Sequence, residues 1–164
     1  MRAGIGFDAH RFVDGRPFIL GGVAIEHSRG LAGHSDADVL AHAIVDAILG
    51  AAGRGDIGMH FDAADERWRN ASSEHFLRFA AAEASAARLT IANIDATVIC
   101  EAPALSPYRD AMRESLAATL VVPSERVSVK ATTTDGMGFT GRGEGIAALA
   151  VALLIDVNEA VAAR

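Results

Sequence analysis

A chain of 164 residues, 51% of them apolar, can bury one hydrophobic core without disulfides or repeats, so we expect a single domain over residues 1–164. Its formal net charge of -6 argues against a nucleic-acid-binding surface and against long-range attraction of an anionic substrate. A phosphorylated ligand would therefore have to be held by local groups, such as metal ions, helix N-termini, backbone amides or a few basic side chains.

Neither the N-terminus nor the most apolar segment has the pattern of a membrane signal. The N-terminal residues reach charges at Arg2 and Asp8 before a hydrophobic region develops, and the apolar run Ile146–Ile155 is only about half a membrane span. The single Cys100 cannot form an internal disulfide, and it continues an alternating apolar run, which is typical of a buried strand thiol. We therefore expect a cytoplasmic protein in a reducing compartment, with no membrane segment and with a structural rather than a nucleophilic cysteine.

The N-terminal part of the chain predicts β structure. Residues 2–7 are followed by the segment Phe18–Ile25, which places Gly21 and Gly22 between two short apolar runs. Two glycines at that point are typical of a tight β-hairpin. The chain is therefore expected to open with strands.

The sequence defines one helix especially well, from Asp36 onward. Ser35 stands where a cap would begin this helix, and Gly53 or Gly55 where it would end. The apolar residues that recur at helical spacing are Val39, Leu40, Ala43, Ile44, Ala47, Ile48 and Ala51.

The rest of the chain predicts an alternation of helices and strands. The expected elements are a helix over Ser73–Arg88, a strand over 91–101, a helix over Pro107–Leu120 capped by Ser106, and a strand over Arg126–Ala131. Periodicity leaves Ile146–Val157 open between a strand and a buried helix, and we favour a strand that continues into a short C-terminal helical tail. The expected fold class is α+β, with a mixed β-sheet and helices packed on one face.

Three residues form a candidate metal site. Asp8 and His10 are two apart on an expected strand, so their side chains leave the same face. His42 lies on the long helix between Asp38 and Asp46, each four residues away. Two imidazoles and a carboxylate suit zinc and leave the fourth tetrahedral position for substrate. Asp38 or Asp46 could orient a histidine through its second ring nitrogen, or could simply be solvated.

Two further segments can bind phosphate. His34 and Ser35 precede the long helix, where unpaired backbone N–H groups favour an anion, although Ser35 could equally be only a cap. The segment Thr132–Asp135 offers three hydroxyls and a carboxylate, which can hold a diphosphate and a cation such as Mg²⁺, although a solvated turn has the same composition.

Several blocks, taken in order, resemble the 2-C-methyl-D-erythritol 2,4-cyclodiphosphate synthase family. The resemblance runs nearly from end to end of the chain. The blocks are Gly4–Phe12, His34–Val39, His42–Ala47, Gly55–Gly58, Lys130–Thr134 and Gly138–Gly145.

The resemblance implies a homotrimer whose active sites lie between neighbouring subunits. Each site would bind 4-diphosphocytidyl-2-C-methyl-D-erythritol 2-phosphate, whose 2-phosphate attacks the β-phosphate to give 2-C-methyl-D-erythritol 2,4-cyclodiphosphate and CMP. One Zn²⁺ per subunit would be held by Asp8, His10 and His42, and a Mg²⁺ or Mn²⁺ ion, with Asp135 as a ligand, would bridge the substrate diphosphate. Positioning and charge neutralisation would dominate such a reaction, because the attacking phosphate is already anionic.

By the same resemblance, individual residues receive roles. The residues placed in catalysis are His34, Ser35, Thr133 and Asp135. Those expected near the methylerythritol part of the substrate are Asp56, Ile57, Gly58, Phe61 and Asp65. Those expected around the cytidine are Cys100, Ala102, Pro103, Ala104, Leu105, Ser106, Ala131 and Thr132. Phe139, Arg142 and Glu144 would lie near the trimer axis or the phosphates, where an isoprenoid diphosphate could bind in an axial cavity.

The chain departs from the family pattern at three places. Asp135 stands where the family usually carries Glu, Ala104 where it often has Lys, and Asp62-Ala63 where it usually has Pro-Asp. Two other functions remain open from the residues alone. One is a zinc phosphohydrolase that activates water on the same triad, and the other is a trimeric binding module for isoprenoid diphosphates in which zinc is structural.

Overall fold

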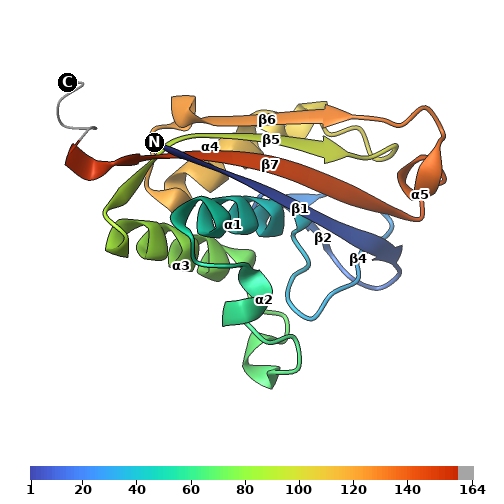
Figure 1. The fold of residues 1–164 in the computed structure, drawn as a ribbon. Helices are drawn as coiled ribbons and strands as arrows, with labels where there is room; N and C mark the ends of the chain where they lie inside the picture. Colours follow the sequence, from blue (N-terminus) through green and yellow to red (C-terminus); the bar gives the residue numbers. More distant parts are fainter. Residues whose placement is uncertain (159–164) are drawn as a thin grey trace.

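The computed structural model describes residues 1–158 and contains one five-stranded mixed sheet with helices packed against it (Figure 1). The strands are β1 (Arg2–Val13), β2 (Phe18–Leu20), β3 (Val23–Ile25), β4 (Gly30–Leu31), β5 (Leu89–Ile99), β6 (Val127–Thr132) and β7 (Gly145–Asp156). The helices are α1 (Val39–Ala52), α2 (Ile57–His60), α3 (Ser73–Ala86), α4 (Arg109–Leu120) and α5 (Gly138–Gly141), with short 3₁₀ helices η1 (Glu66–Trp68), η2 (Ser106–Tyr108) and η3 (Ser124–Arg126). The expected α+β class with helices on a mixed sheet is confirmed.

The large sheet has the order β4-β1-β7-β5-β6. β7 runs antiparallel to both β1 and β5, whereas β5 and β6 are parallel. The separate pair β2–β3 is the predicted hairpin, and Gly21 and Gly22 both have positive φ, as a two-residue turn of this kind requires. α1 packs on β1 and β7, and α3 packs on α1 (Figure 1).

Small residues let α1 approach β1 very closely. A Cβ atom on Gly4 would lie 2.0 Å from the Ala47 carbonyl oxygen, and one on Gly6 would lie 1.9 Å from that of Ala43. Both glycines therefore have a packing role, because any side chain there would push the helix away from the strand. This close contact brings His42 of α1 next to Asp8 of β1.

The start of α1 differs from the prediction. The helix begins at Val39 and its cap is Asp38, whose carboxylate accepts a hydrogen bond from the Ala41 amide at 3.0 Å. Ala37 has a φ of 60°, in the left-handed region, so the backbone cannot be helical before Asp38. The assignment of Ser35 as the cap was therefore wrong, while Gly53, with a φ of 69°, ends the helix as predicted.

Most other elements lie within two residues of their predicted bounds. Ser106 was wrong as a cap, because it begins η2 and α4 starts only at Arg109. Residues 146–156 of the predicted segment belong to strand β7, as favoured, and the segment looked ambiguous because β7 is apolar on both faces. The predicted C-terminal helical tail falls largely on residues 159–164, outside the described part of the chain.

The face of the sheet opposite α1 carries exposed apolar side chains. Ile5 and Phe7 of β1 are 67% and 57% exposed, and their cross-strand partners on β7 are Val151 and Leu149. These four side chains form one continuous surface, which we call the apolar sheet face. No helix among the described residues is long and apolar enough to cross a membrane.

Candidate metal centre and substrate pockets

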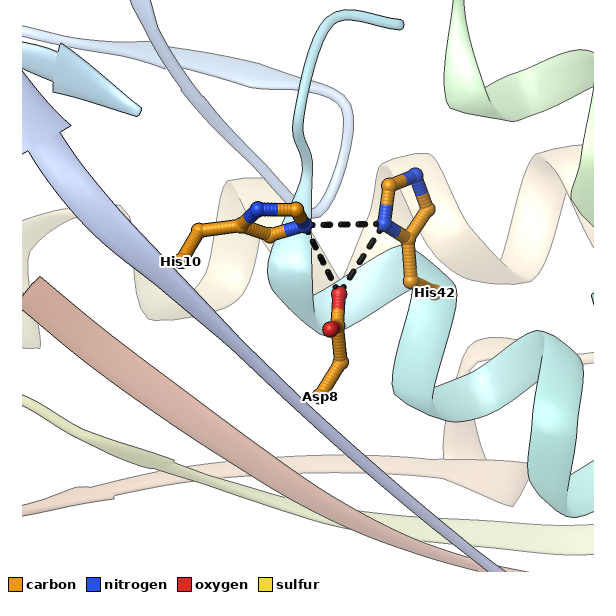
Figure 2. A group of neighbouring side chains, drawn as sticks. All are labelled: Asp8, His10 and His42. Atoms are coloured by element: carbon orange, nitrogen blue, oxygen red, sulfur yellow. Dashed lines mark hydrogen bonds and ion pairs between the residues drawn. The ribbon is translucent and has the colours of Figure 1, made fainter. Parts of the chain in front are cut away.

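Asp8, His10 and His42 converge on one point between β1 and α1 (Figure 2). The Asp8 Oδ2 atom lies 2.9 Å from His10 Nε2 and 3.0 Å from His42 Nδ1, and the two nitrogens are 3.2 Å apart. Three tetrahedral zinc ligands at bond lengths of about 2.0–2.2 Å stand about 3.3 Å from one another. The three atoms therefore fit a single ion after shifts of a few tenths of an ångström, and the chemistry of the donors suits zinc.

The charges of the triad reinforce one another. Burial would raise the pKa of Asp8, but hydrogen bonds from His10 and His42 hold it well below its usual range. Burial would lower the pKa of His42, but its hydrogen bond to Asp8 and the charges of Asp8, Asp38 and Asp36 raise it. Asp8 is thus an anion with two imidazole nitrogens beside it. A divalent cation can bind these three groups by displacing the protons that they share.

The carboxylates expected to orient the histidines have other partners. Asp38 is fully buried and accepts hydrogen bonds from the backbone amides of Gly21, Gly22 and Ala41. Asp46 accepts one from the Ile57 amide at 2.8 Å and thereby ties α1 to α2. The orienting role predicted for Asp38 or Asp46 was therefore wrong.

Hydroxyl groups contact the second nitrogen of His42 instead. Within residues 1–158, His42 Nε2 lies 3.0 Å from Ser73 Oγ and 3.3 Å from Ser35 Oγ. Ser73 in turn bonds Asp36 through both its hydroxyl and its amide. No local sequence pattern predicts the contact between Asp36 and Ser73, since 37 positions separate the two residues.

A cavity of about 280 Å³ opens beside the triad. It contains most of the residues expected to hold the methylerythritol and the attacked phosphate. Its lining residues are Asp8, His10, His34, Ser35, His42, Asp46, Ile57, Gly58, Phe61, Asp62, Ala63, Trp68 and Phe76. Asp46 was expected near the triad, whereas Trp68 and Phe76 were not predicted, although the single tryptophan is a residue type often found in ligand pockets.

Two predicted residues, Asp56 and Asp65, have carboxylates that bond to groups outside the cavity lining. Asp56 caps α2 by accepting the Met59 amide at 2.9 Å. The carboxylate of Asp65 pairs with Arg67, while its carbonyl oxygen lies 2.9 Å from His34 Nε2. Both residues thus shape the rim of the cavity rather than point their carboxylates into it.

The residues predicted around cytidine gather elsewhere. Leu105, Ser106 and Ala131 line a second cavity of about 260 Å³ together with Arg109, Met112, Val129 and Lys130. Cys100 is buried and does not line this cavity, and burial raises the pKa of its thiol to about 11, as suits a structural cysteine. The Cys100 amide donates to the Thr132 carbonyl at 2.9 Å, so the Cys100–Ser106 and Thr132–Asp135 segments are joined.

Glu101 holds the Thr132–Asp135 segment in place. Its Oε1 atom accepts hydrogen bonds from the Thr134 amide at 2.8 Å and from the Gly136 amide at 3.3 Å. Thr133 Oγ1 donates to Asp135 Oδ1 at 3.4 Å, so the hydroxyl and carboxylate predicted to act together are neighbours. Phe139 and Arg142 lie further along, and Arg142 pairs with Glu144 at 2.6 Å.

The two cavities are far apart within one chain. The triad lies on β1 and α1, whereas the second cavity lies at β6, three strands away in the sheet order. At about 4.8 Å per strand this separation is about 14 Å. One chain therefore presents two separate cavities.

Known proteins match this chain over nearly its whole length. A profile of the YgbB family matches residues 1–155. A protein of Moorella thermoacetica named 2-C-methyl-D-erythritol 2,4-cyclodiphosphate synthase is 56% identical over 156 residues, covering 95% of this chain and 96% of the relative.

Solved structures agree with the sequence matches. A 2C-methyl-D-erythritol-2,4-cyclodiphosphate synthase in its CDP-bound form superposes with a TM-score of 0.86 at 36% identity, covering 94% of this chain and all of that chain. The bifunctional IspDF of Campylobacter jejuni gives a TM-score of 0.86 at 41% identity, and the match covers 96% of this chain but 43% of the larger protein. This chain therefore belongs to the YgbB family, and the sequence resemblance to the 2-C-methyl-D-erythritol 2,4-cyclodiphosphate synthases is confirmed.

Proposed function

We propose that this protein converts 4-diphosphocytidyl-2-C-methyl-D-erythritol 2-phosphate to 2-C-methyl-D-erythritol 2,4-cyclodiphosphate and CMP, a step of isoprenoid precursor synthesis. The observation that carries the proposal is the Asp8–His10–His42 triad at the mouth of a cavity, found in a chain 56% identical to a protein named for this product. We place the reaction in the cytoplasm.

The chain's own residues position the reacting phosphates. A zinc ion held by Asp8, His10 and His42 would supply charge neutralisation and polarisation at the β-phosphate. His34 and Ser35 border the same cavity and can donate hydrogen bonds to phosphate oxygens. Phe61, Trp68 and Phe76 form an apolar wall that excludes water from the attacked phosphorus. Exclusion of water favours attack by the substrate's own 2-phosphate over hydrolysis.

The second half of the site would hold the nucleotide. The cytosine and ribose would occupy the cavity at Leu105, Ser106 and Ala131, where the backbone can bond the base edge. Thr133 and Asp135 would face the diphosphate, with Asp135 as a ligand of a bridging Mg²⁺ or Mn²⁺. Asp135 is one methylene shorter than the Glu usual in the family, so we expect it to hold this ion more loosely.

We propose that a second copy of the chain completes this site. The proposed β-phosphate position and the proposed cytidine cavity are about three strand spacings apart in one chain, which supports a site shared between two copies. The apolar sheet face of Ile5, Phe7, Leu149 and Val151 supplies a surface on which copies can pack. We therefore propose a homotrimer in which the triad of one subunit meets the nucleotide loop of its neighbour, with Phe139, Arg142 and Glu144 around an axial cavity that can take an isoprenoid diphosphate.

Product analysis tests the proposed function. The purified protein is incubated with the cytidylylated substrate, zinc and Mg²⁺ or Mn²⁺, and CMP, cyclodiphosphate and inorganic phosphate are each quantified. Equal amounts of CMP and cyclodiphosphate support the cyclase. Release of inorganic phosphate would instead indicate a phosphohydrolase, and a folded, zinc-loaded protein that forms no product would indicate a binding module.

A further inference from the structure

The two nitrogens of His42 have different surroundings. Nδ1 faces Asp8 and His10, and Figure 2 shows the second nitrogen turned away from them. A neutral imidazole carries its proton on only one nitrogen, and only the other has the lone pair that a metal ion needs. The position of that proton therefore decides whether the triad can bind metal through Nδ1.

The Ser73 hydroxyl fixes this position through its own hydrogen bonds. Its oxygen lies within hydrogen-bond distance of Asp36 Oδ1, and a carboxylate oxygen can only accept. The Ser73 proton is therefore directed to Asp36, and the oxygen is left to accept a hydrogen bond from His42 Nε2, 3.0 Å away. Once the Nδ1 lone pair is given to a metal ion in place of Asp8, the remaining ring proton therefore lies on Nε2, with the Ser73 oxygen as its acceptor.

Asp8 Oδ2, 3.0 Å from Nδ1, competes for the ring proton until a metal ion takes its place, whereas the contacts on the far side of the ring favour a proton on Nε2. Asp36 accepts the Asp38 amide on Oδ1 at 3.2 Å and the Ser73 amide on Oδ2 at 2.8 Å, so both oxygens face donors. Ser35 Oγ accepts the Ala37 amide at 3.2 Å, lies 3.3 Å from His42 Nε2, and has a second lone pair that can accept the Nε2 proton. Ser73 is 1% exposed, so water cannot easily replace its hydroxyl.

We propose that Asp36 and Ser73 are positioning residues for the metal centre: together they hold the proton of His42 on Nε2 and leave the Nδ1 lone pair for the ion. The inference deepens the proposed function, because it concerns how the zinc ligand of that site is prepared. It also links the metal to the fold, since Asp36 precedes α1 and Ser73 is the first residue of α3. Partners of this kind on a ligand's far nitrogen commonly change metal affinity by about 10–100-fold.

The ring proton can be observed directly. Long-range ¹H–¹⁵N correlation spectra of the zinc-loaded protein report which ring nitrogen of His42 binds the ion and which carries the proton. We expect Nε2 to carry the proton in the native chain. A proton on Nδ1, or zinc bound through Nε2, would overturn the inference without any variant being needed.

Metal affinity supplies the second readout. Ser73→Ala keeps the backbone amide that bonds Asp36 but removes the hydroxyl, and we expect zinc affinity, measured by competition with a chromophoric chelator, to fall by about 10–100-fold. Ser73→Thr keeps a hydroxyl and should stay close to native affinity. Ser72→Ala is the matched control, because Ser72 caps the same helix through Glu74 and does not contact His42.

The outcomes separate this inference from the cyclase proposal. Neither readout uses substrate, so a protein that fails to form CMP can still confirm the Asp36–Ser73 role. Native zinc affinity in Ser73→Ala, or an equal loss in Ser72→Ala and Ser73→Ala, would contradict a specific effect on His42. Loss of affinity in Ser73→Thr as large as in Ser73→Ala would also count against it.

Discussion

Replacing Gly6 by alanine should damage the metal site from a distance. A Cβ atom at Gly6 would lie 1.9 Å from the Ala43 carbonyl oxygen, whereas real Cβ atoms essentially never approach closer than 3.0 Å. α1 must therefore move away from β1 by about 1.1 Å or more. Ala43 is next to His42 and Gly6 is two residues from Asp8. The movement should therefore lengthen the 3.0 Å contact between Asp8 and His42.

Both stability and zinc affinity should reveal the displacement. Overpacking of this kind costs about 1–3 kcal/mol, which lowers the melting temperature of a chain of this length by several degrees. Thermal unfolding with and without zinc measures the loss, and we expect zinc to stabilise the Gly6→Ala variant much less than the native chain. The control is Gly50→Ala, since Gly50 lies in α1 with no neighbouring atom within 4 Å and alanine favours the helix. Native stability and native zinc affinity in Gly6→Ala would refute the close-packing argument.

The contacts of His42, Glu101 and Arg142 each predict a measurable effect. In metal-free protein, the raised pKa of His42 gives stability that is complete below the ordinary histidine pKa of about 6.5 and lost as pH rises through the folded value. The lowered pKa of Asp8 gives stability that is lost only as pH falls below about 3.9. Denaturant unfolding at several pH values should therefore show an alkaline decline that His42→Gln removes, and an unchanged decline in that variant would contradict the assignment. Glu101→Ala should weaken CDP binding by about tenfold, the equivalent of one hydrogen bond to a charged group. Glu101→Gln keeps the acceptor and should stay near native affinity. Calorimetry measures both affinities, and equal losses in the two variants would show that the charge of Glu101 matters instead. Arg142→Ala should weaken farnesyl diphosphate binding relative to an Arg78→Ala control on α3, and unchanged affinity would exclude Arg142 from an axial site.

Periodicity predicted most of the fold because most elements have one apolar face. α1 and the β2–β3 hairpin could be assigned from apolar spacing and two glycines, and β7 was harder because both of its faces are apolar. The predicted starts of α1 and α4 were wrong. No sequence pattern predicts that Ala37 adopts a left-handed φ or that η2 precedes α4. Local backbone conformation of this kind depends on tertiary contacts such as those of Asp38 with Gly21 and Gly22.

The site was predictable where residue type and family pattern agreed. The triad of Asp8, His10 and His42 came together as expected from spacing. The partners of those residues did not, because Asp36 and Ser73 meet across 37 positions and Asp38, the closer carboxylate in sequence, is occupied by backbone amides. Contacts between distant segments follow from the packing of α3 on α1, which no local pattern encodes.

The central claim is that the metal triad of one copy and the nucleotide loop of another together catalyse formation of the cyclodiphosphate. Trimers that mix two inactive variants test it. His42→Ala removes the first half-site and Thr133→Ala the second, so each variant alone should form almost no CMP. Trimers assembled at random from equal amounts of both should recover about a quarter of native activity, since one neighbour pair in four joins two intact halves. Mixed trimers as inactive as their parents, beside an active native protein, would contradict a site shared between subunits, and a native trimer that releases no CMP would contradict the cyclase itself.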